Sequence, residues 1–446
     1  MSAAAMVGGR GHMHTEIGYR RHGVQGSAFW GQGYAAPKST RIFNVAWFAC
    51  FFSLLMLGLN ARLGAAAAAL FLLPWSFLVI RAPQLALAKT LENAPLFLLP
   101  GLALLSTTWS QYPETSLRAS IQFLVTVEIA ILAGSLTNPR TFVSALLHAL
   151  TVIMVVSLVI DRGESLRGGP ALMGVFQSKN QLAFYIVMQM IAALTAAFDR
   201  LQSILTRLIA LFSLFVGPIC LVAAQSTGAI VFSIPAIGAL IVIMAVGKLP
   251  VAARATVIAA ALLAFIATII AIAGFVDDFG VILDLLGKDS TLTGRLYLWQ
   301  TAHYLIEQSP ILGVGYQAFW QVGNPPAEEL WAASFEESGS GFNFHNLYFN
   351  TAVELGLVGV ASLLLTFLAL AIRLLRSLIL KPSPPVYFAA ALFIFVCSTS
   401  FIEVNQLYQF HIGTVLLGAM WIYSGARPLY PYGTILTPAK RNALPV

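Results

Sequence analysis

Residues 346–372 read NLYFNTAVELGLVGVASLLLTFLALAI, an apolar run in which Glu354 is the single charged side chain. About 20 helical residues, each rising about 1.5 Å, cross the hydrocarbon core of a membrane. Such runs recur along the chain, which is 58% hydrophobic and 10% charged, with a mean hydropathy of +0.82. Because soluble domains average about 25% charged residues, this composition predicts an all-α, polytopic membrane protein.

About twelve membrane-spanning helices are predicted within a transmembrane helical domain at 42–424. Several contain Gly or Pro, which membrane helices tolerate where neighbouring groups satisfy the backbone. No repeat pairs the two halves of the chain, and this disfavours a transporter architecture. The approximate bounds are 42–60, 63–80, 93–109, 119–136, 141–160, 180–198, 207–224, 228–247, 254–274, 346–372, 386–402 and 405–424.

The basic residues predict the orientation. With the N-terminus inside, 18 of the 25 Lys and Arg residues fall on the cytoplasmic side and 7 on the outer side. Because Lys and Arg favour cytoplasmic loops, both termini are predicted to be cytoplasmic. Residues 1–41 are Gly-rich and polar and lack the apolar stretch of a signal peptide, so they are interpreted as a disordered cytoplasmic tail. Residues 425–446 are interpreted as a second cytoplasmic tail.

The net charge of +7 does not indicate a nucleic-acid partner. The charges lie between apolar runs, as topology signals and contacts to lipid headgroups do. Cys50, Cys220 and Cys397 lie inside apolar segments without metal-ligand spacing, so we interpret them as core residues. No motif for a nucleotide is found, and no cofactor or metal is predicted.

Two long segments are predicted on the outer side, at 161–181 and 275–345. Loops longer than about 15 residues within a compact fold are usually functional. The second contains TLTGRLYLWQTAHYLIEQSP (291–310), where apolar residues such as Leu296 and Trp299 recur at helical spacing. This pattern predicts an amphipathic helix that lies on the membrane surface or on the bundle and ends in a turn at Pro310.

His345 and Arg295 are the leading candidates for chemistry in the loop at 275–345. Histidine as a residue type titrates near pH 6.5, so His345 could accept a proton near neutrality. The alternative is a histidine at the membrane edge that bonds a backbone carbonyl. The rigid five-donor fork of Arg295 suits phosphate oxygens. Its alternative role is a contact with lipid headgroups.

Four further polar residues are candidates for substrate binding or for its support. Arg167 and Lys179 are cations close to the predicted outer face, against the general trend of the chain, although headgroup contact would also explain them. Glu403 could orient one of these cations, and Asn346 is predicted to cap the helix that follows it. Glu128 lies within a predicted span and is interpreted as part of a structural network.

Several of these stretches resemble the bacterial superfamily of O-antigen ligases and Wzy-type polysaccharide polymerases. The specific part is KDSTLTGRLYLWQTAHYLIEQSPILGVGYQAFW followed by FHNLYFNTAVELGLVGV, at 288–320 and 344–360. MGVFQSKNQLAFY and FIEVNQL are also similar to that family. The pairing of DSTLTGR with PILGVGYQAFW is most similar to the exopolysaccharide polymerase branch.

The resemblance implies a metal-independent glycosyltransferase in the bacterial inner membrane that acts at the periplasmic face and inverts the anomeric carbon. Its donor would be an oligosaccharide on undecaprenyl pyrophosphate. His345 would be the catalytic base, and Arg295 would bind the pyrophosphate. Arg167 and Lys179 match the neighbourhood of the family's G-x-F-x-x-K-N motif. One departure is Thr227 in AQSTGAIV, where the family usually has a cation.

The resemblance favours a polymerase that joins lipid-linked repeat units into exopolysaccharide. A ligase that transfers the same donor to a lipid A core is the alternative, and a transporter of the lipid-linked glycan is a third. Membrane lipid is an expected partner of any of these. A chain-length regulator and export proteins are expected partners of the polymerase.

Overall fold

The computed structural model describes residues 45–425, apart from 161, 165–169, 274–294 and 335–341. The predicted tails at 1–41 and 425–446 therefore lie outside the described residues, except for Gly425. Arg167 and the first part of the predicted outer loop at 275–345 also lie outside them.

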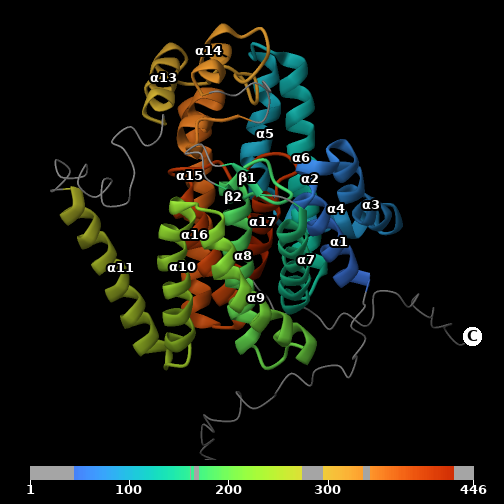
Figure 1. Ribbon diagram of the computed structural model, residues 1–446, viewed down its shortest axis with the longest axis vertical. Helices are drawn as coiled ribbons and strands as arrows, with labels where there is room; N and C mark the ends of the chain where they lie inside the picture. The colour runs from blue at the N-terminus through green and yellow to red at the C-terminus, as the bar shows by residue number, and fades with distance from the viewer. Residues whose placement is uncertain (1–44, 161, 165–169, 274–294, 335–341, 426–446) are drawn as a thin grey trace, which may run out of the picture. The chain divides into compact units, whose positions relative to one another are not determined.

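The described chain is almost entirely helical (Figure 1). The one ladder of strands in it pairs β1 (Arg162–Glu164) with β2 (Pro170–Leu172) in antiparallel fashion. The helices are α1 (Val45–Gly58), α2 (Asn60–Leu63), α3 (Ala65–Arg81), α4 (Pro83–Glu92), η1 (Ala94–Phe97), α5 (Leu98–Leu105), η2 (Ser106–Thr108), α6 (Pro113–Leu136), α7 (Pro139–Ile160), α8 (Lys179–Phe198), α9 (Ile204–Ala223), α10 (Thr227–Val246), α11 (Val251–Ala273), α13 (Arg295–Gln308), α14 (Pro325–Ala333), α15 (Leu347–Leu380), α16 (Pro384–Thr399) and α17 (Ile412–Ser424).

Seven of the described helices are long and apolar enough to cross a membrane: α6, α7, α8, α9, α10, α11 and α15. The pair α3 and α4, bent by 108° at its break, would make an eighth span. The other predicted segments correspond to shorter apolar helices at Val45–Gly58, Ala94–Thr108, Pro384–Thr399 and Ile412–Ser424. The multi-pass helical class is therefore confirmed, whereas the number of about twelve spans stays a prediction.

The core forms where the spanning helices pack in pairs. α8 packs along α9, α1 along α7, α6 along α17 and α10 along α16 (Figure 1). Phe184 and Phe395 are fully buried and stack with their ring centroids 5.3 Å apart. Where α6 meets α17, Gly418 faces Ala130, and small residues of this kind let membrane helices approach closely.

The segment between α11 and α15 has an aromatic core of its own. Figure 1 shows α13 and α14 beside the first turns of α15, at one end of the helices. Phe319 and Phe344 are buried there with ring centroids 5.1 Å apart, and Trp320 lies 4.9 Å from Phe344. The helix predicted within 291–310 is confirmed as α13. Its inner face packs through Leu298 and Ala302.

A backbone clasp, which we define as residues 310–316, fixes this outer segment to α15. The amide of Leu357 donates to the carbonyl of Pro310 at 2.8 Å, and the amide of Gly315 donates to the carbonyl of Glu354 at 2.9 Å. Between these bonds α15 breaks at Gly356, whose φ of 64° and ψ of −166° are open essentially only to glycine. The predicted continuous span at 346–372 is thus a helix interrupted at Gly356 and continued to Leu380.

Candidate functional site

The carboxylate of Glu403 is the centre of a polar network, and its partners come from three other parts of the chain. Arg295 Nη2 lies 2.6 Å from Glu403 Oε1, and Asn180 Nδ2 donates to the same oxygen at 2.9 Å. His345 Nδ1 lies 3.1 Å from Glu403 Oε2. The side chains of Glu403, Arg295 and His345 are 16%, 19% and 28% exposed, so each is shielded but reachable from solvent.

His345 is placed by the residues on both sides of it. Its backbone has a φ of 48°, and its amide donates to the side-chain oxygen of Asn343 at 2.7 Å. Phe344 before it is fully buried, and its carbonyl accepts from Trp299 Nε1. Asn346 after it caps α15, as predicted, by accepting from the amides of the first turn. These contacts hold the imidazole at a defined position at the start of α15.

Asn346 also connects His345 to the chain segment that carries Glu403. Its Nδ2 donates to the carbonyl of Phe401 at 3.0 Å, and the amide of Leu347 donates to the carbonyl of Ser400 at 2.9 Å. Both the oxygen and the nitrogen of the Asn346 side-chain amide are thus bonded to protein groups. Its predicted contact with substrate stays a prediction.

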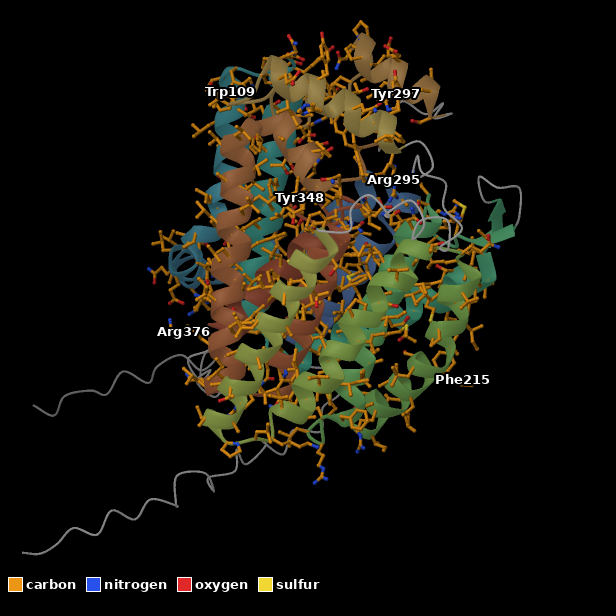
Figure 2. All side chains as sticks on the ribbon, turned by 90° about the vertical axis from the view of Figure 1, so that its left-hand side faces the viewer. Trp109, Phe215, Arg295, Tyr297, Tyr348 and Arg376 are labelled. Atoms are coloured by element: carbon orange, nitrogen blue, oxygen red, sulfur yellow. The ribbon has the colours of Figure 1, made fainter. Side chains whose placement is uncertain are left out.

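Arg295 is the first residue of α13 and lies on the side of that helix nearest to the membrane helices (Figure 2). α13 is held in place because Trp299, one turn later, stacks on Phe349 of α15 with ring centroids 6.0 Å apart. Glu403 thus pairs with Arg295, a cation other than the two that the sequence suggested for it, Arg167 and Lys179. One of the five guanidinium donors is used for this bond.

Asn180 and Ser226 are members of the network that the sequence analysis missed. Ser226 donates through Oγ to Asn180 Oδ1 at 2.9 Å, and the other end of that amide reaches Glu403. Asn180 follows Lys179 in the motif already singled out, and Ser226 precedes Thr227, the position of the missing cation. Both therefore stood next to recognised positions, but their orientation depends on how three helices meet. We call Glu403, His345, Arg295, Asn180 and Ser226 the Glu403 network.

Four helices begin at this network. Lys179, Thr227, Arg295 and Leu347 are the first residues of α8, α10, α13 and α15. The N-terminus of each helix carries a partial positive charge and free amide donors. The site therefore combines helix N-termini with at least one guanidinium, which is an environment suited to anions.

The charge state of Glu403 follows from opposing effects. Burial raises the pKa of its carboxyl group, but charge interactions and hydrogen bonds with His345 and Arg295 outweigh burial, so the pKa is lowered from its ordinary value. An ionised carboxylate can only accept hydrogen bonds. When His345 is neutral, Nδ1 must therefore carry the proton, and Nε2 presents a lone pair. A carboxylate holds the catalytic histidine of serine proteases in the same tautomer.

The remaining predicted residues are placed as follows. Lys179 is half-buried at the start of α8, next to Asn180, while Arg167 lies outside the described residues. Glu128 accepts from Thr90 Oγ1 at 2.7 Å, in agreement with a structural role. Within the described residues, no three His, Cys, Asp or Glu side chains gather in a way that could hold a metal ion.

The fold and the Glu403 network thus define a multi-pass membrane protein with a polar site where several helices begin. A family model described as O-antigen ligase matches residues 208–364, which include Ser226, Arg295 and His345. The exopolysaccharide production protein ExoQ of Rhizobium meliloti (strain 1021) is 31% identical over 388 residues, which are 85% of this chain and 88% of that protein. The chain therefore belongs to the family of O-antigen ligases and exopolysaccharide production proteins.

Proposed function

We propose that this protein polymerises oligosaccharide repeat units carried on undecaprenyl pyrophosphate, by inverting glycosyl transfer at the periplasmic face of the inner membrane. The observation that carries the proposal is the single carboxylate shared by His345 and Arg295. One partner is suited to accept a proton and the other to bind an anion, and such a reaction needs both at once. The name of the relative from Rhizobium meliloti supports an exopolysaccharide as the product.

In the proposed reaction, the neutral form of His345 acts as general base. Its Nε2 takes the proton of an acceptor hydroxyl while that oxygen forms a bond to the anomeric carbon of the donor. The bond from the anomeric carbon to the phosphate oxygen breaks on the opposite face, and the electron pair leaves with the lipid diphosphate. Glu403 stabilises the imidazolium that forms, and the proton then passes to solvent.

Arg295 neutralises the diphosphate, whose negative charge grows as the bond breaks. Lys179 at the start of α8, and Arg167, are proposed to assist it. Thr227 replaces the cation expected at the start of α10, but the N-terminus of that helix carries partial positive charge at the same place. The convergence of four helix starts supports binding of a strongly anionic group without that cation.

Ligation of the same lipid-linked glycan to a lipid A core is the second candidate, because the matching family model is described as O-antigen ligase. Both reactions use the same base and the same anion site, and they differ in the acceptor. For the polymerase, we further propose a chain-length regulator and export proteins as partners.

A deletion strain complemented with defined variants tests the proposal. Wild type should restore long polymer that is not attached to lipid A, whereas His345→Ala should lower polymer by about 100-fold or more, the usual contribution of a general base. The matched control is His303→Ala, since His303 on α13 is 71% exposed and pairs with Glu307 one turn away. Gel profiles of total glycan report the length of the polymer, and gel profiles of lipid A report whether glycan is attached to it.

The outcomes separate the candidates. Glycan that appears on lipid A with wild type alone would establish the ligase instead. Normal polymer from His345→Ala, with the protein present in the membrane at wild-type level, would remove His345 from the mechanism.

A further inference from the structure

A polar cavity lined by none of the residues of the Glu403 network takes no part in the chemistry above. It has a volume of about 100 Å³ and is bounded by the end of α1, the first turns of α8 and the segment 408–411 before α17. A water needs about 10–15 Å³ in the same measure, so the cavity has room for several water-sized groups. It would admit part of one sugar and would not admit a whole oligosaccharide.

Three amide side chains line this cavity: Asn60, Gln177 and Gln181. None of them makes a side-chain hydrogen bond with another described residue; Asn60 and Gln177 are exposed, and Gln181 is half-buried. Each amide offers two donors on nitrogen and an acceptor on oxygen. A ligand that satisfies them must itself both donate and accept, as hydroxyl groups do.

The other walls of the cavity are aromatic. Phe176 and Tyr185 lie with ring centroids 4.5 Å apart on one side, and Tyr408 stacks on His411 at 4.5 Å on the other. Binding sites for small neutral molecules typically combine such apolar surfaces with a few polar groups that fix orientation. Hydroxyl-rich rings with apolar C–H faces fit this lining better than a lipid chain does.

The cavity carries no charge among the described residues that line it. No Asp, Glu, Lys or Arg is part of the lining, and burial lowers the pKa of His411 to about 3, although the backbone carbonyl of Asn405 opposes the shift. His411 is therefore neutral near pH 7, and its Nε2 makes no hydrogen bond within the described chain. A phosphate group would find no counter-charge here, so the ligand is neutral at this point.

Two features relate the cavity to the Glu403 network. Gln181 on the cavity directly follows Asn180, which binds the Glu403 carboxylate. Tyr408 lines the cavity, and its pKa is raised by burial and further by the negative charge of Glu403, so its phenol lies within electrostatic range of that carboxylate.

The chain just before Phe176, which lines the cavity, is fixed in place. Arg62 donates to the carbonyls of Gly174 at 2.8 Å and Val175 at 3.1 Å, and the amide of Val175 donates to Ser157. Gly174 has a φ of 61° and lies directly against Ser157, so no larger residue fits there. The cavity is thus preformed, which lowers the entropic cost of binding.

We propose that this cavity binds the terminal sugar of the acceptor glycan and presents its hydroxyl to His345. The proposal rests on the proposed function and adds to it the position of the second substrate. The reacting sugar of the donor carries its diphosphate directly, so it belongs beside Arg295. The reacting sugar of the acceptor carries no phosphate, and a neutral cavity lined by amides and aromatic rings matches it.

Direct binding tests the proposal independently of catalysis. The probe is the free repeat-unit oligosaccharide, released from the strain's own exopolysaccharide, which has neither lipid nor diphosphate. Titration into protein in lipid nanodiscs, followed by calorimetry, should show saturable binding by wild type. Gln181→Leu and Gln177→Leu keep the side-chain size and remove the hydrogen bonds, and each should weaken binding by about 5- to 10-fold. Gln84→Leu, an exposed glutamine on α4 outside the cavity, is the matched control.

Kinetics give a second readout. With a fixed lipid-linked donor, Gln181→Leu should raise KM for the acceptor by about 10-fold and leave kcat within about 3-fold of wild type. A merely structural role would lower the amount of folded protein and leave the KM of that protein unchanged.

The two proposals fail separately. Absence of binding by wild type, or wild-type affinity in both cavity variants, overturns the acceptor site and leaves the role of His345 intact. His345→Ala should bind the oligosaccharide as wild type does, because the base is not needed for binding. If that variant also makes normal polymer, the proposed chemistry fails while the glycan site stands.

Discussion

At the scale of single residues, Glu403 provides the counter-charge of Arg295 and fixes the tautomer of His345. It receives Arg295 and Asn180 on one carboxylate oxygen and His345 on the other. A carboxylate that is 16% exposed with three donors is stable as an anion because each donor replaces a lost contact with water. Its removal would leave Arg295 without its counter-charge and His345 without a fixed tautomer.

Substitution of this carboxylate should therefore act through charge rather than size. Glu403→Gln should lower polymer formation by at least about 10-fold, because the amide presents a dipole where the imidazolium needs an anion. The measurement is the initial rate of polymer formation in membranes that contain equal amounts of wild type or variant. Glu307→Gln, the same change at a 62% exposed position on α13, is the matched control. Full activity in Glu403→Gln would rule out a catalytic role for the carboxylate.

The same substitution should change the pH dependence of stability. Because the pKa of Glu403 is lowered in the folded protein, its contribution to stability is complete above the ordinary value of 4.5 and is lost as pH falls through the lower folded-state pKa. Thermal unfolding of detergent-solubilised protein should favour wild type over Glu403→Gln at pH 7 and at pH 5. The difference should shrink below pH 4.5, and a constant difference would contradict the assigned charge.

At the scale of elements, the kink of α15 explains how the outer segment is positioned. The clasp at 310–316 bonds to α15 through main-chain groups on both sides of Gly356. Trp109, the residue after η2, also donates through Nε1 to the carbonyl of Leu312 at 3.0 Å, so the clasp is held from this side as well. α13, which carries Arg295, is connected to this clasp by the single residue Ser309. The position of Arg295 therefore depends on a backbone crossing about three turns into α15.

Gly356→Ala should consequently disrupt the site from a distance. A Cβ at this position would overlap the carbonyl of Ile311, and the backbone conformation alone costs about 1–3 kcal/mol for a residue other than glycine. Lower yield and lower melting temperature are expected on fluorescence-detected size exclusion. The control is Gly238→Ala on α10, where an added Cβ meets no atom within 4 Å. Equal stability of both variants would show that the crossing is dispensable.

The elements also show how far the sequence could predict the site. Hydropathy located the helices, and chemistry singled out Arg295, His345 and Glu403. The kink at Gly356 was not predicted because its cause is the backbone of Ile311, about 45 residues away in the sequence, which leaves no trace in local periodicity. Asn180 and Ser226 escaped for a similar reason, since a polar residue at a helix start is ordinarily a cap. Only the meeting of α8, α10 and α16 gives them another role.

At the scale of the whole molecule, the number of spans shows the limit of hydropathy alone. An apolar run near 20 residues satisfies the length criterion whether the helix is straight or broken. α3 and α4 together pass that test and yet bend by 108° between Arg81 and Pro83. Pro83 opens α4 and, by disfavouring helix at the residue before it, favours the break. A sequence window cannot distinguish a broken span from a re-entrant pair, because the apolar content is the same.

The predicted orientation has a direct test. Figure 2 shows Arg295 and Arg376 toward opposite ends of the helices, and the positive-inside rule assigns the first to the periplasm. Glu307→Cys, on exposed α13, should react with a membrane-impermeant maleimide in intact cells. Arg200→Cys, in the turn after α8, should react only after the membrane is opened. The reverse pattern would invert the topology and exclude a periplasmic reaction.

The native cysteines should add little to the labelling signal. Cys50 and Cys220 are buried and Cys397 is half-buried, all within helices, so the wild-type chain should give little background. Strong labelling of wild type would require a cysteine-free background before the orientation could be assigned.

The sharing of one carboxylate by an arginine and a histidine has a consequence for the order of events in the proposed catalytic cycle. If a diphosphate draws Arg295 away from Glu403, the carboxylate loses its guanidinium counter-charge. A proton bound by His345 would then replace the lost positive charge beside the Glu403 carboxylate, because the imidazolium would form the ion pair in place of Arg295. Arrival of the donor would thus prepare the base, and an acceptor that arrived alone would find it less ready.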